Sequence, residues 1–417
     1  MTRYLTMTKL FSVPMIFIYF VHLPPLQAED SPTTLSLQQC MEKALALHPS
    51  EHAARMRLRA AELRQKASGA YRNPKVSIES ENINAEESLQ MTYALTQEIE
   101  LGGQRSARQN AAKAEQTFVE TTTTVRRSQL LSEVAKVFTE TLATQHRVTL
   151  AKESAQLSQA VLEIARRKLE AGKCAPLEVD RALAEMALAQ SELNKAESDL
   201  KNAKAELASY LLNDELSLVE LTATPWPTTL NLEEQDFSNA VLSGPECRNS
   251  RADSQRLQAQ AQSLKADTRP VLEIGGGLRR MGPDDSYVLS IGMELPLSNR
   301  GRQEAASAQL DADAADAEQR DSTRRLLVQA KKLRNLYLSC EQEILTLRND
   351  ILPALERAYS ATEKGYHEGK LGYLDILDSK RSRLDIRRRL NEMENECLSL
   401  RAELGRLCGT SLSISNP

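Results

Sequence analysis

Residues 89–101 read Leu-Gln-Met-Thr-Tyr-Ala-Leu-Thr-Gln-Glu-Ile-Glu-Leu, with apolar side chains at most odd positions. Residues 287–297, Tyr-Val-Leu-Ser-Ile-Gly-Met-Glu-Leu-Pro-Leu, alternate in the same way. Successive side chains of a β-strand point to opposite faces, so each stretch predicts a strand with one apolar face and one polar or small face. This pattern is typical of strands with lipid outside and water inside. The side chains expected to face lipid are Leu89, Met91, Tyr93, Leu95, Tyr287, Leu289, Ile291 and Met293.

Each of these strands has a weaker partner in the sequence. Residues 75–83 and 271–279 alternate less regularly, and the polar stretches 84–88 and 281–286 would form the connecting loops. An edge hairpin packed on a soluble core would show the same alternation. The strands alone therefore leave the choice open, and two further features favour the membrane.

The first feature is the N-terminus. Arg3 and Lys9 precede a short apolar run at 10–21, and Leu26-Gln27-Ala28 offers small residues for cleavage. This order predicts a secretory signal peptide at residues 1–28. An uncleaved N-terminal anchor is the alternative, although the apolar run is too short to cross a bilayer comfortably.

The second feature is an internal repetition. Residues of the same type recur about 196 positions apart, as in Ala44 and Ala240, Pro49 and Pro245, Pro74 and Pro270, and Leu101 and Leu297. We therefore predict an internal duplication, with repeats at 29–210 and 236–408. Residues 211–235 would form an equatorial segment between the repeats, and 409–417 a C-terminal tail. Trp226 is expected to anchor this segment by packing.

Long helices fill most of each predicted repeat, and a first helix is expected at about 37–71 and again at about 237–267. Only 4% of residues are aromatic and 26% are charged, a mixture that favours extended helices over a compact globule. Residues 105–170 contain no proline and predict a helix of about 65 residues, roughly 100 Å long. Apolar residues at seven-residue spacing (Leu150, Leu157, Ile164) predict burial against neighbouring helices. Pro353 interrupts a later helix. It either kinks the helix and so narrows the tube, or it is tolerated by local packing.

Four strands per chain cannot close a barrel. Open strand edges in lipid would leave backbone groups unpaired, so several chains must share one barrel. Two chains would give a barrel of eight strands, with an interior that side chains can fill. Three chains would give a barrel of twelve strands. A conduit therefore favours three or more chains around a rotational axis. The expected fold is mainly α with a small β part: antiparallel helical hairpins forming an α-barrel, plus four transmembrane strands per chain.

The sequence resembles the TolC-like outer membrane efflux protein family over nearly the whole mature chain. The resemblance is carried by residues 37–49, 73–74, 98–105, 170–180, 270, 295–302 and 366–381. Residues 97–105, Gln-Glu-Ile-Glu-Leu-Gly-Gly-Gln-Arg, look most like the branch that serves cobalt–zinc–cadmium efflux. The resemblance implies a homotrimer with a 12-stranded barrel in the outer membrane of a Gram-negative bacterium and a helical tunnel through the periplasm.

The same resemblance implies partners. A periplasmic adaptor would dock on the two helix-to-helix turns, driven by an inner-membrane pump of the RND type. The family's turn motif maps to Gly172, Lys173, Leu177 and Glu178, and to Gly369, Lys370, Leu374 and Asp375. Cys174 lies in the first turn, and the sequence does not assign it a role.

The sequence contains no motif typical of a metal site or of an enzyme's active site. The five histidines are scattered, and no spacing typical of a metal site occurs, so no metal or cofactor site is expected. No acid, base and nucleophile gather in one motif, which argues against an enzyme. The formal net charge of −4 argues against nucleic acid as a partner.

Two pairs of residues each allow two interpretations. Asp375 and Asp378 share a helix face and could ring a pore mouth that attracts cations, or could be a solvated face paired with Lys370 or Lys380. Cys340 and Cys397 lie equally far from the Gly369 turn, so a disulfide between them is a hypothesis, with a small buried side chain as the alternative.

The leading hypothesis for function is the exit duct of a tripartite efflux system, passing substrates that could include heavy-metal cations. One alternative is the same duct used for type I protein secretion. The other is a soluble periplasmic scaffold of coiled coils, which would need neither lipid nor a shared barrel.

Overall fold

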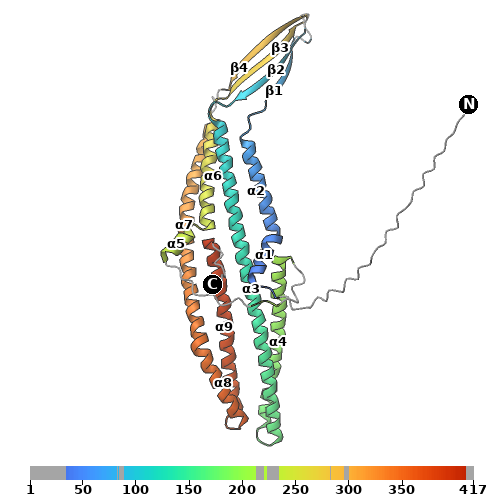
Figure 1. Cartoon of the computed structure of the whole chain (residues 1–417), viewed down its shortest axis with the longest axis vertical. Coiled ribbons are helices and arrows are strands. Elements are labelled where there is room, and N and C mark those ends of the chain that lie inside the picture. Colours follow the sequence, from blue (N-terminus) through green and yellow to red (C-terminus); the bar gives the residue numbers. More distant parts are fainter. Residues whose placement is uncertain are drawn as a thin grey trace, which may run out of the picture.

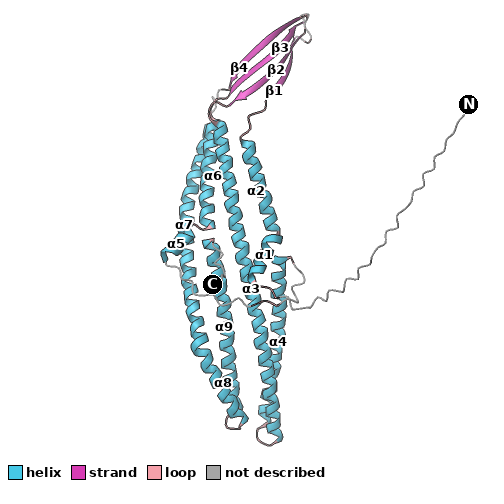
Figure 2. Cartoon of the chain, in the orientation of Figure 1, coloured by secondary structure: helices cyan, strands magenta, loops and turns pink. Residues whose placement is uncertain are grey.

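The chain forms a long helical shaft with a small sheet at one end (Figures 1 and 2). The structure is a computed structural model that describes residues 34–81, 83, 89–212, 220–222, 234–281, 283–294 and 300–409. The predicted signal peptide, the loop at 84–88, Leu295, Leu297, Trp226 with most of 211–235, and residues 410–417 lie outside the described residues.

Both halves of the chain repeat one order of elements. The first half contains α1 (Leu37–Leu47), α2 (Pro49–Ser68), β1 (Lys75–Glu81), β2 (Gln90–Ile99), α3 (Gln104–Glu170) and α4 (Pro176–Leu211). The second half contains α5 (Glu234–Leu242), α6 (Pro245–Asp267), β3 (Leu272–Met281), β4 (Asp284–Met293), α7 (Arg300–Thr346), a π-helical turn (Leu347–Ile351), α8 (Leu352–His367) and α9 (Tyr373–Cys408). The predicted long helix is confirmed, since α3 has 67 residues.

The helices expected at about 37–71 and 237–267 are instead two helices each, which corrects the sequence interpretation. His48 is extended, with φ −63° and ψ 130°, because a residue before proline avoids the α region. Its Nδ1 accepts a hydrogen bond from the Ser50 N–H (3.3 Å), so the residue that ends α1 also caps α2.

A π-helical turn lies immediately before Pro353. A proline in an α-helix cannot donate to the carbonyl four residues earlier, and its ring clashes there. The π-helical turn at Leu347–Ile351 contains the residue four positions before Pro353, and α8 begins at Leu352. The described residues thus accommodate Pro353 by a local irregularity in the backbone hydrogen bonding.

The four strands form one antiparallel sheet in the order β1-β2-β3-β4. The six-residue loop expected at 281–286 is not observed, because β3 continues to Met281 and β4 begins at Asp284. Met281 pairs with Asp284, so the paired parts of the two strands come within two residues of each other along the chain. Gly277 permits close strand approach, because an added Cβ would lie 2.3 Å from the Tyr93 carbonyl oxygen.

The helices pack as two hairpins. One consists of α3 and α4 and the other of α7, α8 and α9, and the two meet along α3 and α9 (Figure 1). Apolar clusters stabilise these helices around Phe138 and Tyr337, at the same height of the shaft, and around Tyr366, nearer the turns. No described helix combines the length and the hydropathy needed to cross a bilayer.

The cysteine pair lies in the cluster around Tyr337. Cys340 of α7 and Cys397 of α9 are both buried and lie level, as the hairpin register predicts. Cys340 Sγ donates a hydrogen bond to the Met393 carbonyl (3.3 Å). Both cysteines are free thiols here, so the structure contains the buried core pair and not the hypothesised disulfide.

Candidate functional site

The two turns between long helices lie together at the end of the shaft farthest from the sheet (Figure 1). They share one backbone design. Gly172 and Gly369 have φ of +67° and +75°, which favours glycine. The Lys173 N–H donates to the Lys168 carbonyl (2.8 Å), and the Lys370 N–H donates to the Gly365 carbonyl (2.8 Å). Both helices therefore end in the same Schellman motif, which explains why Gly-Lys recurs in both halves.

The helices that leave these turns are also equivalent. Leu177 and Leu374 are the second residues of α4 and α9, and they are 56% and 60% exposed. Glu178 and Asp375 are the third residues, where acidic side chains favour the positive end of the helix dipole. We define these eight predicted residues as the tip surface: Gly172, Lys173, Leu177, Glu178, Gly369, Lys370, Leu374 and Asp375.

The carboxylates of α9 near the tip are exposed. Asp375 Oδ2 accepts a hydrogen bond from the Gly372 N–H (2.8 Å), so this residue caps its own helix. Asp378 lies one turn further along the same face. The lysines considered as their partners bind elsewhere, because Lys370 pairs with Glu368 (2.6 Å) and Lys380 contacts α3.

Just above the tip, one cation joins the two hairpins. Lys168 of α3 donates to the Tyr366 carbonyl of α8 (2.9 Å) and lies 3.5 Å from the centroid of the Tyr366 ring. Burial raises the pKa of Tyr366 to about 12. Cys174, whose role the sequence left open, donates its thiol to the Ala165 carbonyl (3.4 Å) and contributes to the local packing.

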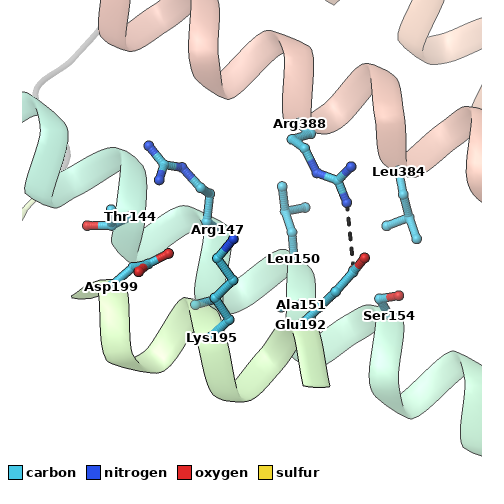
Figure 3. A pocket seen from close by; sticks show the side chains of 11 residues that line it. Thr144, Arg147, Leu150, Ala151, Ser154, Glu192, Lys195, Asp199, Leu384 and Arg388 are labelled. Atoms are coloured by element: carbon cyan, nitrogen blue, oxygen red, sulfur yellow. Dashed lines mark ion pairs between the residues drawn. The ribbon is translucent and has the colours of Figure 1, made fainter. Parts of the chain in front are cut away.

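Further up, ion pairs bridge α4 and α9 across α3. Arg381 contacts Glu185 (2.9 Å), and Arg388 contacts Glu192 (3.9 Å), so successive partners are spaced seven positions apart on each helix. A cavity of about 280 Å³ lies beside the second pair, between α3, α4 and α9 (Figure 3). Arg147 and Lys195 also line it. The hairpins therefore meet through separate polar contacts at several heights of the shaft.

At the opposite end of the molecule, strand register places seven of the eight expected lipid-facing residues on one face of the sheet, whereas Leu89 precedes β2 and is exposed. Residues paired across antiparallel strands share a face. Tyr93 pairs with Leu278 and Leu278 with Tyr287, so the predicted apolar rows of β2 and β4 lie on the same side. We call this face the apolar face, although it also carries the Arg280–Asp285 ion pair (2.9 Å) at the Met281 end of β3. Its apolar residues are Val76, Ile78, Met91, Tyr93, Leu95, Ile99, Leu272, Ile274, Leu278, Tyr287, Leu289, Ile291 and Met293. The other face carries mostly polar residues and glycine.

The segment 97–105 joins the sheet to the shaft. Glu100, with a side chain only 6% exposed, accepts hydrogen bonds from Arg108 (2.7 Å) and Arg72 (3.3 Å). Buried Gln104 donates to the Arg269 carbonyl (3.1 Å) and accepts from the Gly102 N–H (2.8 Å). The segment that carries the family resemblance is thus the joint between the two parts.

The hydrogen bonds that Glu100 accepts at this joint predict that the protein loses stability in acid. Hydrogen bonds from Arg108 lower the pKa of Glu100 below its usual 4.5. Since the folded carboxyl has the lower pKa, its stabilisation is present above about pH 4.5 and is lost as pH falls through the lowered value. We expect Glu100→Gln to reduce the acid dependence of the melting temperature between pH 6 and 3, measured by circular dichroism. Exposed Glu120→Gln is the control, and an unchanged acid profile in Glu100→Gln would contradict the prediction.

The sequence interpretation missed the contacts between hairpins. Lys168 and Arg388 lie in no motif, and Lys380 and Arg381 lie at the end of the segment 366–381 without a predicted contact to another hairpin. Only their partners on another helix give these residues a role. One signal was available: Glu185 and Glu192 have the same seven-residue spacing as Arg381 and Arg388. This spacing identifies a helix face but does not identify the helix it contacts.

Comparisons with known proteins agree with this architecture. CzcC, a cobalt-zinc-cadmium resistance protein of Cupriavidus metallidurans, is 29% identical over 299 residues, which are 69% of this chain and 70% of that protein. The solved structure of CusC superimposes with a TM-score of 0.77 at 16% identity, covering 90% of this chain and 92% of CusC. The outer membrane protein VceC of Vibrio cholerae gives 0.76 at 18% identity, covering 90% and 97%.

The sequence profile of the family described as outer membrane efflux protein matches residues 40–211 and 237–410. The two matched segments contain both helical hairpins and all four strands. They account for most of the chain, which therefore belongs to the outer membrane efflux protein family.

Proposed function

We propose that three copies of this chain form one exit duct, with a shared 12-stranded barrel in the outer membrane and a helical tunnel in the periplasm. The observation that carries the proposal is the four-stranded sheet, which has an apolar face and two outer strands, β1 and β4. Pairing β4 of one copy with β1 of the next would satisfy both edges. Three copies give twelve strands, enough for a lumen.

The tip surface is the proposed docking site for a periplasmic adaptor, which would connect the duct to an inner-membrane pump of the RND type. Exposed Leu177 and Leu374 supply apolar contact area, and the two turns present it in the same backbone geometry. Exposed Asp375 and Asp378, repeated around a three-fold axis, would ring the tunnel mouth. Such a ring favours cations as cargo.

Heavy-metal cations are the proposed cargo class, supported by the resistance function named for CzcC and by the segment 97–105. We infer transport and not catalysis, because the family consists of efflux proteins. A protein-secretion duct would share the same barrel and shaft. A soluble scaffold would leave the apolar face of the sheet without a function.

Conductance of the purified protein in planar bilayers tests the duct. We expect stable single-channel steps from a detergent-extracted oligomer whose mass is three times that of the chain. The expected mobility of this oligomer on gels changes on boiling, since a closed barrel resists unfolding until heated. A monomer that stays soluble without detergent and conducts no ions would overturn the proposal in favour of the scaffold.

A further inference from the structure

Lys380 is a buried amine at the contact between the two hairpins. It lies on α9, two turns beyond the tip, and only 3% of the residue is exposed. Its Nζ donates to Ser158 Oγ (2.5 Å) and to the Ser154 carbonyl (3.3 Å), both on α3. In the part of the chain that the structure describes, the oxygens bonded to this amine are therefore neutral.

The surrounding charges do not replace a counter-ion. The titratable or charged groups facing the amine are Glu185 and Glu192 of α4, and Tyr373, Arg381 and Arg383 of α9; α3 contributes the two serines. Glu185 already pairs with Arg381 (2.9 Å), and Glu192 lies near Arg388 (3.9 Å). A charged Lys380 is thus costly in this contact, whereas a neutral amine keeps a hydrogen-bonding role there.

We propose that Lys380 is a protonation-controlled latch: the neutral amine holds the two hairpins together near the tip, and the ammonium favours their separation. The inference rests on the proposed duct function, in which a closed tip must open. The cluster around Tyr366 joins both hairpins, so opening requires α8 and α9 to move relative to α3 and α4 and to expose part of that cluster. That movement would expose Lys380 to water, where the ammonium is stable.

The direction of the pH effect follows from the two states. Burial lowers the pKa of Lys380 from 10.5 in the closed arrangement, and hydration restores it in the open one. Protonation therefore favours opening. The cost of closing is fully present below the lowered pKa and disappears as pH rises to about 10.5. Each pKa unit of lowering changes the ratio of open to closed protein about tenfold.

Lys380→Met separates charge from packing. Methionine fills a similar volume without a charge, and Ser158 remains satisfied because its hydroxyl donates to the Ser154 carbonyl (2.9 Å). Hydrogen exchange, followed by mass spectrometry on the full-length oligomer from pH 7 to 10, would report opening in residues 154–162 and 376–388. At each pH, the variant is compared with wild type, so the intrinsic dependence of exchange on pH cancels.

We expect wild type to exchange faster than Lys380→Met at pH 7, by about tenfold per pKa unit of lowering, with the difference shrinking toward pH 10. Lys380→Arg, which keeps its charge over this range, is expected to exchange fast at every pH. Exposed Lys201→Met is the control and should match wild type. Equal exchange in wild type and Lys380→Met, or a difference independent of pH, would overturn the latch.

The same samples distinguish the latch from the duct. Conductance recorded in parallel should show a higher open fraction in wild type than in Lys380→Met at pH 7. A protein that never conducts but keeps the pH-dependent exchange would refute the duct and leave the latch standing. A protein that conducts but exchanges equally in wild type and Lys380→Met would refute the latch and leave the duct standing.

Discussion

Leu289→Arg is expected to abolish assembly in the outer membrane, whereas Ser290→Arg at the next position is expected to be tolerated. Leu289 lies in the middle of β4 on the apolar face and is 77% exposed in the single chain. An arginine facing lipid at the bilayer midplane costs about 2–4 kcal/mol, and a trimer would contain three. Ser290 points to the opposite face, beside Gly275, where water in the lumen can hydrate the charge.

The measurement is the amount of heat-modifiable oligomer in the outer membrane fraction, compared with total expressed protein. Leu289→Met serves as an apolar control at the same position. Normal assembly of Leu289→Arg would contradict the lipid-facing assignment of β4. Failure of both arginine variants, with Leu289→Met unaffected, would show that the two faces of β4 do not differ in their surroundings.

The second large effect is expected from Leu177→Asp combined with Leu374→Asp, which should abolish export and preserve the channel. Both leucines are exposed, so their loss removes little buried area within the chain. Aspartate in the first turn also suits the helix dipole, so α4 and α9 should fold normally. If each leucine is a docking anchor worth about 2 kcal/mol, the pair weakens adaptor binding by about 10³-fold.

Growth of a deletion strain on cobalt, zinc or cadmium, complemented by each variant, measures export. The double variant should conduct in bilayers like wild type and fail to restore resistance. Leu177→Met with Leu374→Met keeps the apolar surface and should restore it. Full resistance with the double aspartate variant would place docking outside the tip surface. No gain of resistance from the wild-type chain would exclude these metals as cargo.

The sequence by itself determined the type and order of most elements. Strand periodicity identified the apolar rows of β2 and β4, and the proline-free stretch identified α3 almost to the residue. The recurring Gly-Lys pairs located both turns, because a left-handed residue after a helix strongly favours glycine. These features depend on residues close in sequence, whose local geometry is fixed by backbone sterics.

Local signals were less reliable where two local preferences compete. The β3–β4 turn looked like a polar six-residue loop, yet backbone pairing between Met281 and Asp284 extends both strands into it. The break at His48 followed from the proline that comes after it, whereas one helix had been expected from 37 to 71. In the turn, backbone pairing outweighed side-chain composition; at His48, the steric restriction before proline ended the helix.

Only the tertiary structure decided which faces meet. Heptad spacing predicted burial of Leu150, Leu157 and Ile164, which are half-buried in the single chain. Lys380, Lys168 and Arg388 acquired roles solely from partners more than 190 residues away. The joint at Glu100 likewise draws one arginine from before β1 and another from α3. The physical reason is that electrostatic and desolvation energies depend on distances in space, and those distances are set by how the two hairpins and the sheet pack together.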